Sequence, residues 1–447
     1  MYLVSSNALG AHDFDVYAQL FSQLRTGRIA TGNTNDTIYG VDLEFVPSLQ
    51  LVLTAPGYTG SLDYRLRIFS TWTTDVRESL LLFHQVSTQH GFTLSRRTSL
   101  STSGNFGYGE VDYSRSLFIF NNGNTVNADA NTSANTSTST STNANTNANA
   151  NTLPGTRPNA SVLRYMSFGG AIGLSHRLSR KNQLGLSASY NGTRQLTENT
   201  ATAPPAAGAV PIDRRPTSDN TIVSTRVDTA ISGRDRISNN VSAAYATFST
   251  GRKDIPVTYT LGWNRQLGTT SNFSLDGGAL VLFTFREPAN NPNDEWKTAV
   301  LPAVRVSFST QPVLNTQTPW TFTVQGSFDT FVDQFVGALV PRTGVSVTAT
   351  TQINERMGFE AALLATAPLY AMLGEDLGAA VTYPTTLSAR SAMVFELKEN
   401  ISLSTGILAN TGATALFESD LSFGRQELMG FVSITMILDP NHSAINE

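Results

Sequence analysis

The sequence feature that most constrains the fold is an alternation of apolar and polar side chains with a period of two residues. Phe14, Val16, Ala18 and Leu20 alternate with polar or aromatic neighbours, and the same pattern recurs almost to the C-terminus. Successive side chains of a β-strand point to opposite faces, so each such segment is predicted to be a strand with one apolar face. The clearest later examples are Leu62–Ile68, Leu184–Asn191, Val257–Asn264, Trp320–Phe328, Ile401–Ile407 and Val432–Leu438. No fixed sequence repeat accompanies the alternation, which disfavours a soluble solenoid or another repeat fold.

The polar faces of these strands carry few charges. Charged residues make up 14% of the chain, against about 25% in an average soluble domain. Serine, threonine, glycine, asparagine and glutamine take their place. No apolar run approaches the roughly 18 residues of a transmembrane helix. Low charge without a long apolar segment is typical of a membrane β-barrel, in which lipid-facing and lumen-facing residues alternate along each strand.

The connections between strands are of two kinds. Short turns are predicted at 46–48, 95–97, 179–181, 354–356 and 398–400. Long polar connections are predicted at about 25–36, 121–160, 195–222, 286–296, 366–385 and 411–427. This asymmetry favours an all-β fold: a transmembrane antiparallel up-and-down β-barrel with short periplasmic turns and long extracellular loops. Because a spanning strand needs about 9–11 residues, we expect about 18 strands, within a range of about 16–20.

The whole chain, 1–447, is predicted to form one integral outer-membrane barrel domain. The segment at about 121–160 consists almost entirely of Asn, Thr, Ser and Ala, and it is predicted to be a disordered loop because it has too little apolar surface to fold. A short tail, 439–447, follows the last strand, which is predicted to end at Leu438. The first residues lack the basic and apolar regions of a signal peptide, so we expect the numbering to begin after its removal.

Few residues suggest chemistry. A net charge of −4 gives no reason to expect nucleic acid as a partner. The chain has no cysteine, and its five histidines form no metal-ligand pattern. The pairs Gly169–Gly170 and Gly277–Gly278 precede no helix, so we interpret them as positions where strands bend or pack closely. The sequence therefore predicts no enzyme activity, no cofactor and no metal site.

The inward faces of the strands are more informative. If the apolar faces meet lipid, a set of charged and aromatic side chains points into the lumen. These candidate lumen-lining residues are Asp13, Asp15, Tyr17, Asp42, Glu44, Asp63, Arg65, Arg67, Arg305, Asp329, Glu360, Arg390 and Glu396. Charges of both signs there can pair as structural ties or set the electric field of an aqueous channel. Phe21 and Phe69 share the inward parity, and inward aromatic rings are able to stack on the apolar faces of sugar rings.

Several short motifs in the first 115 residues resemble a known group of proteins. The segments 36–40 (DTIYG), 45–49 (FVPSL) and 62–66 (LDYRL), followed by 94–100 (LSRRTSL) and Gly109–Glu110, are similar to outer-membrane β-barrels associated with bacterial exopolysaccharide export systems. The similarity covers about a quarter of the chain. It implies a barrel of about 18 strands whose lumen passes or guides a polysaccharide together with periplasmic export proteins. It implies no catalytic residues.

The leading hypothesis from the sequence is a passive outer-membrane passage for a secreted polymer such as exopolysaccharide. Its expected partners are outer-membrane lipid and lipopolysaccharide, the polysaccharide, and periplasmic export proteins. Two alternatives remain open: a general diffusion porin for small solutes, and a structural or adhesive surface barrel that displays long polar loops.

Overall fold

The computed structural model of the chain describes residues 13–30, 37–73, 79–112, 162–196, 217–249, 251–286, 296–311, 319–333, 338–369, 385–413 and 423–438. The predicted loop at 121–160 and the tail 439–447 lie outside these residues. Within the described residues no helix is long and apolar enough to cross a membrane.

These residues form 18 β-strands in one sheet. In chain order the strands are β1 (Asp13–Ala30), β2 (Thr37–Ala55), β3 (Tyr58–Thr73), β4 (Ser79–Ser95), β5 (Thr98–Asp112), β6 (Val162–Arg177), β7 (Asn182–Gln195), β8 (Ser218–Ala230), β9 (Asp235–Phe248), β10 (Arg252–Gln266), β11 (Ser271–Arg286), β12 (Lys297–Thr310), β13 (Trp320–Asp333), β14 (Ala338–Asn354), β15 (Met357–Pro368), β16 (Thr385–Lys398), β17 (Ile401–Ala413) and β18 (Phe423–Leu438).

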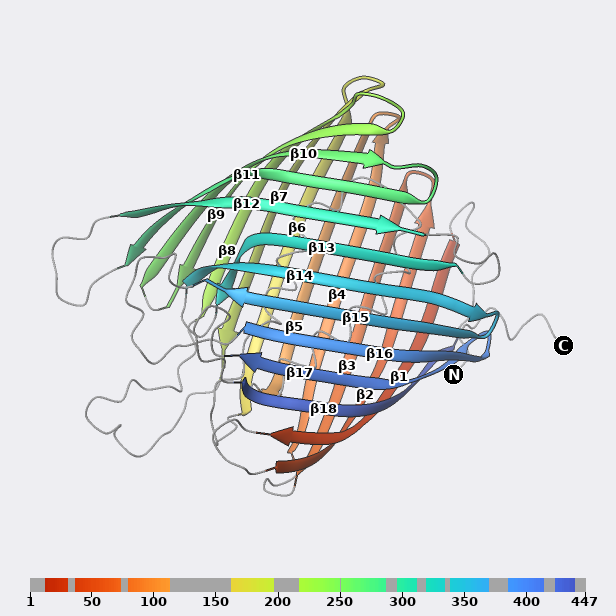
Figure 1. Cartoon of the computed structure of the whole chain (residues 1–447). Coiled ribbons are helices and arrows are strands. Elements are labelled where there is room, and N and C mark those ends of the chain that lie inside the picture. The colour runs from red at the N-terminus through yellow and green to blue at the C-terminus, as the bar shows by residue number, and fades with distance from the viewer. Residues whose placement is uncertain are drawn as a thin grey trace.

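Every strand pairs antiparallel with its neighbours in the chain, and β1 pairs with β18, so the sheet closes into an up-and-down barrel (Figure 1). The predicted strand number and topology are confirmed. β1 begins and β18 ends at the same rim, and tight turns such as Pro56–Gly57 and Arg96–Arg97 join strands there. We refer to it as the short-turn rim and to the opposite end as the long-loop rim.

The predicted turn at 46–48 is wrong, because these residues lie within β2. Pro47 has no N–H group, and proline was therefore interpreted as a strand break. In the structure Pro47 keeps its place in the ladder opposite Leu20 of β1, while the recorded pairing with β3 skips Val46 and Pro47. The interruption of the β2–β3 ladder is tolerated because β2 remains paired with β1 along its other edge.

The predicted long connections begin too early or end too late in several places. The connection expected at 25–36 is strand up to Ala30, because β1 stays paired with both β2 and β18 to that residue. Likewise β8 begins at Ser218 and β18 at Phe423, inside segments expected to be loops. Polar residues at strand ends do not mark the end of a strand when the side chains face a polar interior.

The outer face of the barrel is strongly apolar. Large exposed side chains that alternate with inward ones include Val41, Leu43 and Phe45 on β2, and Val432 and Ile434 on β18. Val300 of β12 is 70% exposed. Contiguous apolar surface of this extent is unfavourable in water, whereas in a bilayer it matches the hydrocarbon.

One sector of the wall is incomplete. β12 and β13 pair only where Val304–Thr310 meets Phe322–Phe328, and their long-loop ends diverge (Figure 1). Beyond that point β13 pairs only with β14, up to Asp333 opposite Ala338. This two-stranded tip, residues 329–333 and 338–342, is referred to below as the β13–β14 hairpin.

The hairpin lies against the inner side of the barrel wall. Leu339 and Phe328, which have the parity of the outer face, pack on inward side chains of other strands. The buried cluster beneath them consists of Ala246, Phe248, Leu280, Leu282, Leu301 and Ala303. The wall is therefore double-layered in this sector, and the hairpin narrows the lumen towards the long-loop rim.

The glycine pair of β11 shows how closely adjacent strands approach. A Cβ atom on Gly278 would overlap the carbonyl oxygen of Tyr259 in β10, whereas one on Gly277 meets nothing within 4 Å. The predicted close packing thus applies to Gly278 and not to Gly277.

We therefore expect Gly278→Ala to destabilise the folded barrel by about 1–3 kcal/mol, because backbone must move to make room. Gly277→Ala is the matched control and should leave stability unchanged or raise it by less than about 1 kcal/mol, since alanine restricts the unfolded chain. The measurement is the unfolding equilibrium of each variant in detergent. Equal stability of the two variants would contradict the close approach.

Candidate functional site

The inner surface of the barrel follows from the exposed apolar residues of each strand. In β2 the exposed Val41, Leu43 and Phe45 alternate with Asp42 and Glu44, which therefore face inward. The pairing registers carry this parity from strand to strand around the barrel.

Parity places nearly all the predicted lumen-lining residues on the inner face. They are Asp15, Tyr17, Asp42, Glu44, Asp63, Arg65, Arg67, Arg305, Asp329, Glu360, Arg390 and Glu396. Asp13 is the first residue of β1, opposite Thr54, and its side chain lies outside the described part of the structure. That these residues line an open path remains a prediction.

The innermost charges of β1–β3 form a buried cluster. Glu44 accepts a hydrogen bond of 3.0 Å from Nη2 of Arg25, and its other carboxylate oxygen contacts Nη2 of Arg67. Arg25 is 1% exposed and its guanidinium lies 5.9 Å from the centre of the Phe69 ring. Asp42, which lies on the same inward face of β2 two residues before Glu44, is also buried. Two arginines thus share one carboxylate, so this group acts as a structural tie across three strands.

The remaining predicted charges form separate local pairs or stay exposed. The pairs are Asp63 with Arg65 (2.8 Å), Asp329 with Arg342 (2.9 Å) and Glu360 with Arg390 (3.9 Å). Arg390 also lies over the Phe431 ring. Arg305 and Glu396 are exposed on the inner face. The sequence analysis did not indicate how these charges divide into pairs.

Sequence analysis missed two important inner residues, Arg25 and Asp254. Arg25 was assigned to a loop, although the odd-numbered inward parity of Asp15 and Tyr17 continues through it. Asp254 is fully buried, and both of its oxygens lie 3.0 Å from Nε of Arg252. Its Oδ2 also accepts a 2.7 Å hydrogen bond from the backbone N–H of Leu339. The spacing of Arg252 and Asp254 on one face of a strand was the available signal.

The interior differs between its two ends. Towards the long-loop rim, inward side chains such as Gln23, Arg25, Leu81 and Phe83 are buried. Towards the short-turn rim, inward side chains such as Gln89 are exposed. Inward side chains of the described strands are therefore largely buried near the long-loop rim and exposed near the short-turn rim.

One part of the inner wall, on β5–β7, is nearly free of charge. Its inward side chains are hydroxyls, amides, glycines and one alanine, Ala171, from Ser167 to Ser175 in β6 and from Gln183 to Thr193 in β7. The hydrogen-bonding residues are Ser99, Ser101, Ser103, Asn105, Ser167, Ser175, Gln183, Ser187, Ser189, Asn191 and Thr193. We refer to this surface as the neutral wall. Ser101 and Ser103 are exposed, whereas Ser189 and Thr193 are buried and Thr193 bonds to Ser218. The exposed part of this wall offers hydrogen-bond donors and acceptors and no fixed charge.

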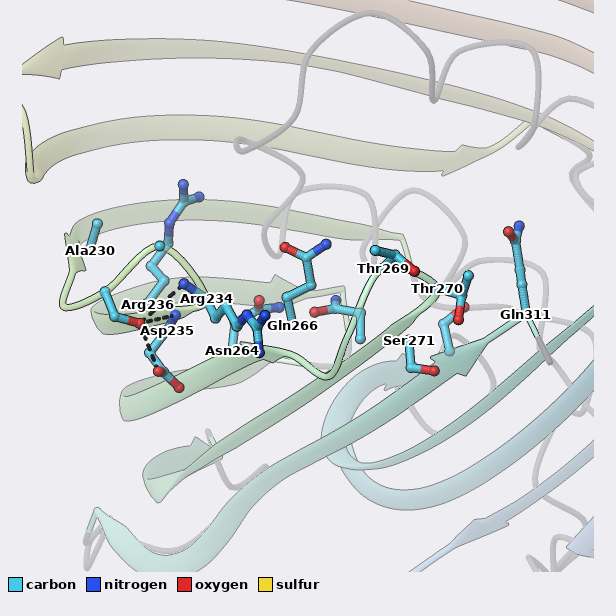
Figure 2. Close-up of a pocket in the computed structure, with 14 residues that line it drawn as sticks. Ala230, Arg234, Asp235, Arg236, Asn264, Gln266, Thr269, Thr270, Ser271 and Gln311 are labelled. Carbon is cyan, nitrogen blue, oxygen red and sulfur yellow. Dashed lines mark hydrogen bonds between the residues drawn. The ribbon is translucent and has the colours of Figure 1, made fainter. Parts of the chain in front are cut away.

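A polar hollow of ≈ 500 Å³ lies at the short-turn rim (Figure 2). Its lining comes from the β8–β9 and β10–β11 turns and from the adjacent ends of β8–β12. Arg234 and Arg236 supply positive charge, and Asn264 and Gln266 supply amides. Its one carboxylate, Asp235, accepts hydrogen bonds from Oγ of Ser232 (2.8 Å) and Nε1 of Trp263 (3.1 Å).

The strand histidines belong to the outer face. His84 is 2.9 Å from the hydroxyl of Tyr64, and His90 is 2.9 Å from that of Tyr58, each through Nδ1. Among the described residues no group of three His, Asp or Glu side chains is placed to hold a metal ion. These histidines are best explained as partners of outward-facing tyrosines.

No family model and no curated protein sequence matches the chain. Among solved structures the chain is similar to OpdL of Pseudomonas aeruginosa, with 10% identity over 95% of this chain and 99% of that chain and a TM-score of 0.40. It is similar to the copper transporter OprC, with 9% identity over 97% and 84% of the two chains and a TM-score of 0.45. It is also similar to a bacterial polysaccharide outer membrane secretin, with 8% identity over 94% and 98% and a TM-score of 0.31. At these values the similarities carry no argument about function.

The buried cluster around Glu44 makes a testable prediction. Glu44→Gln removes the carboxylate that Arg25 and Arg67 share, and an uncompensated buried charge costs about 3–5 kcal/mol. We therefore expect a large loss of barrel stability, measured by unfolding in detergent. The matched control is Glu110→Gln, which breaks the exposed 2.8 Å pair with Arg164 and should change stability little. Similar effects of the two substitutions would show that the Glu44 cluster is not a tie.

Proposed function

We propose that the chain is an outer-membrane channel through which a polysaccharide leaves the cell, supplied by export proteins on the periplasmic side. The observation that carries this proposal is the closed 18-stranded barrel with an apolar outer face and a neutral, hydrogen-bonding inner wall. Barrels of 16–18 strands are wide enough to enclose an aqueous channel. The resemblance in the first 115 residues supports the assignment of a polysaccharide as cargo.

The neutral wall suits a sugar polymer for an energetic reason. Each sugar hydroxyl exchanges a hydrogen bond with water for one with a serine or asparagine, and the net gain of such an exchange is only about 0.5–1.5 kcal/mol. Many weak and similar sites let a chain advance without being held at one position. The short-turn rim, with its polar hollow, would receive the chain from the periplasm, in keeping with the short periplasmic turns of such barrels.

The first test is single-channel conductance of the refolded protein in a planar bilayer. We expect stable conductance, and transient blocks when a neutral polysaccharide is added on the side of the short-turn rim. No conductance from demonstrably folded protein would contradict the channel.

The second candidate function is a general diffusion porin for small solutes, which the burial of inward side chains near the long-loop rim favours. A liposome-swelling assay, which measures the rate at which small sugars enter vesicles that contain the protein, separates the two functions. Rapid uptake of mono- and disaccharides, without any block by polymer, would support the porin and contradict polymer passage.

The neutral wall itself is tested by Ser103→Leu. Loss of one hydrogen bond of about 1 kcal/mol should shorten the mean duration of polymer blocks by about fivefold. Thr102→Leu is the control, because the neighbouring residue faces outward in the same strand. Equal block durations in both variants would show that this wall does not contact the polymer.

A further inference from the structure

The β13–β14 hairpin is a separate unit within the barrel wall. It is paired within itself from Asp329 opposite Arg342 to Asp333 opposite Ala338. On the β13 side it leaves the wall at Phe328 opposite Val304, where the pairing with β12 ends. On the β14 side it stays joined to β15 at its base, where Arg342 pairs with Pro368 and the N–H of Leu369 donates to the carbonyl oxygen of Pro341. Gly326 and Gly344 lie next to that base on the two strands, where small residues allow the backbone to bend.

Two kinds of contact hold the hairpin inside. Phe328 and Leu339 pack on the apolar inner cluster of β9, β11 and β12. The N–H of Leu339 donates to Asp254, whose carboxylate is fixed by Arg252. This bond connects β14 to β10, so the hairpin reaches across the inner side of β11 and β12.

One edge of β12 is available for the hairpin to pair with. In the described part of the chain, residues 297–303 of β12 pair with β11 and with no strand on their other side. Backbone groups on an open edge have no partners within a membrane. Continuing the register of Val304 with Phe328 places Val300 opposite Val332. Pro302 supplies no N–H group to this edge, which weakens a complete ladder and makes release possible.

The side chains of the hairpin suit both positions. Phe328, Leu339 and Pro341 have the parity that faces lipid in a completed wall, and the same apolar face now covers the inner cluster. Asp329 and Arg342, paired on the opposite face, remain on the lumen side in either arrangement. An element can switch between two packings when they differ by only a few kcal/mol.

We propose that the β13–β14 hairpin is the gate of the channel. The gate is closed when the backbone N–H of Leu339 is hydrogen-bonded to Asp254, and it is open when the hairpin pairs with residues 297–303 of β12. The proposal rests on the channel function, and it adds the mechanism that controls passage. Swinging outward would clear the lumen near the long-loop rim and complete the wall at the same time.

Disulfide trapping tests the gate, since the chain has no cysteine of its own. Val300→Cys with Val332→Cys should cross-link only when the hairpin is paired with β12. Phe308→Cys with Val324→Cys is the matched control, because these residues are opposite each other in the β12–β13 ladder below the hairpin and should cross-link in both arrangements. Adding Asp254→Ala to the first pair should accelerate its cross-linking. Asp228→Ala, which breaks a similarly spaced inner pair with Arg226, should not.

Conductance of the trapped protein links the movement to passage. We expect the Val300–Val332 disulfide to raise single-channel conductance about twofold or more, because a wider interior conducts more, and reduction to reverse the change. The gate is overturned if the control pair cross-links fully while Val300 and Val332 never do, even with Asp254→Ala. It is also overturned if trapped and reduced channels conduct equally. If the disulfide forms but neither state conducts, the proposed channel function fails, and the gate fails with it.

Discussion

The structure depends on one constraint, which is that the backbone N–H and C=O groups of a sheet must find partners where no water reaches them. A sheet with an apolar outer face meets this constraint by closing on itself, and the long antiparallel ladder between β1 and β18 makes the closure. Strands can then be polar inside and apolar outside along their whole length. The sector between β12 and β13 is the exception, and the loss of ladder there is offset by burial of apolar side chains beneath the hairpin.

Most charged side chains of the interior form ion pairs with one another. Arg25, Glu44 and Arg67 form a compact group, and most other inward charges pair with a neighbour on the same or the next strand. Buried ion pairs add little net stability compared with apolar packing. Their role here is to hold adjacent strands in one register at depths where a missing partner would be costly.

The alternation of apolar side chains predicted the all-β class, the number of strands and the face on which most inner charges lie. It did so because a barrel in lipid separates its two faces more sharply than a soluble sheet does. Pro47 was misinterpreted because a sequence shows the missing N–H group but not the second ladder that holds β2 in place. Arg25 was missed because a charged strand end resembles a loop. The hairpin was not predictable, since Phe328 and Leu339 have the same pattern whether they face lipid or an inner cluster.

The neutral wall of β5–β7 and the charged group of β1–β3 stand on different parts of the same ring of strands. Fields from fixed charges fall off within about 8 Å at physiological ionic strength. Arg226 and Asp228 of β8 lie opposite Gly185 and Gln183 at the short-turn end of this wall, so only the part of the wall farther from that rim lies beyond their reach. In a channel of the proposed kind, the movement of a neutral molecule along that part would depend little on salt concentration. If the barrel is the proposed channel, a small ion would instead respond to the exposed inner charges, so salt concentration would affect neutral chains and ions differently.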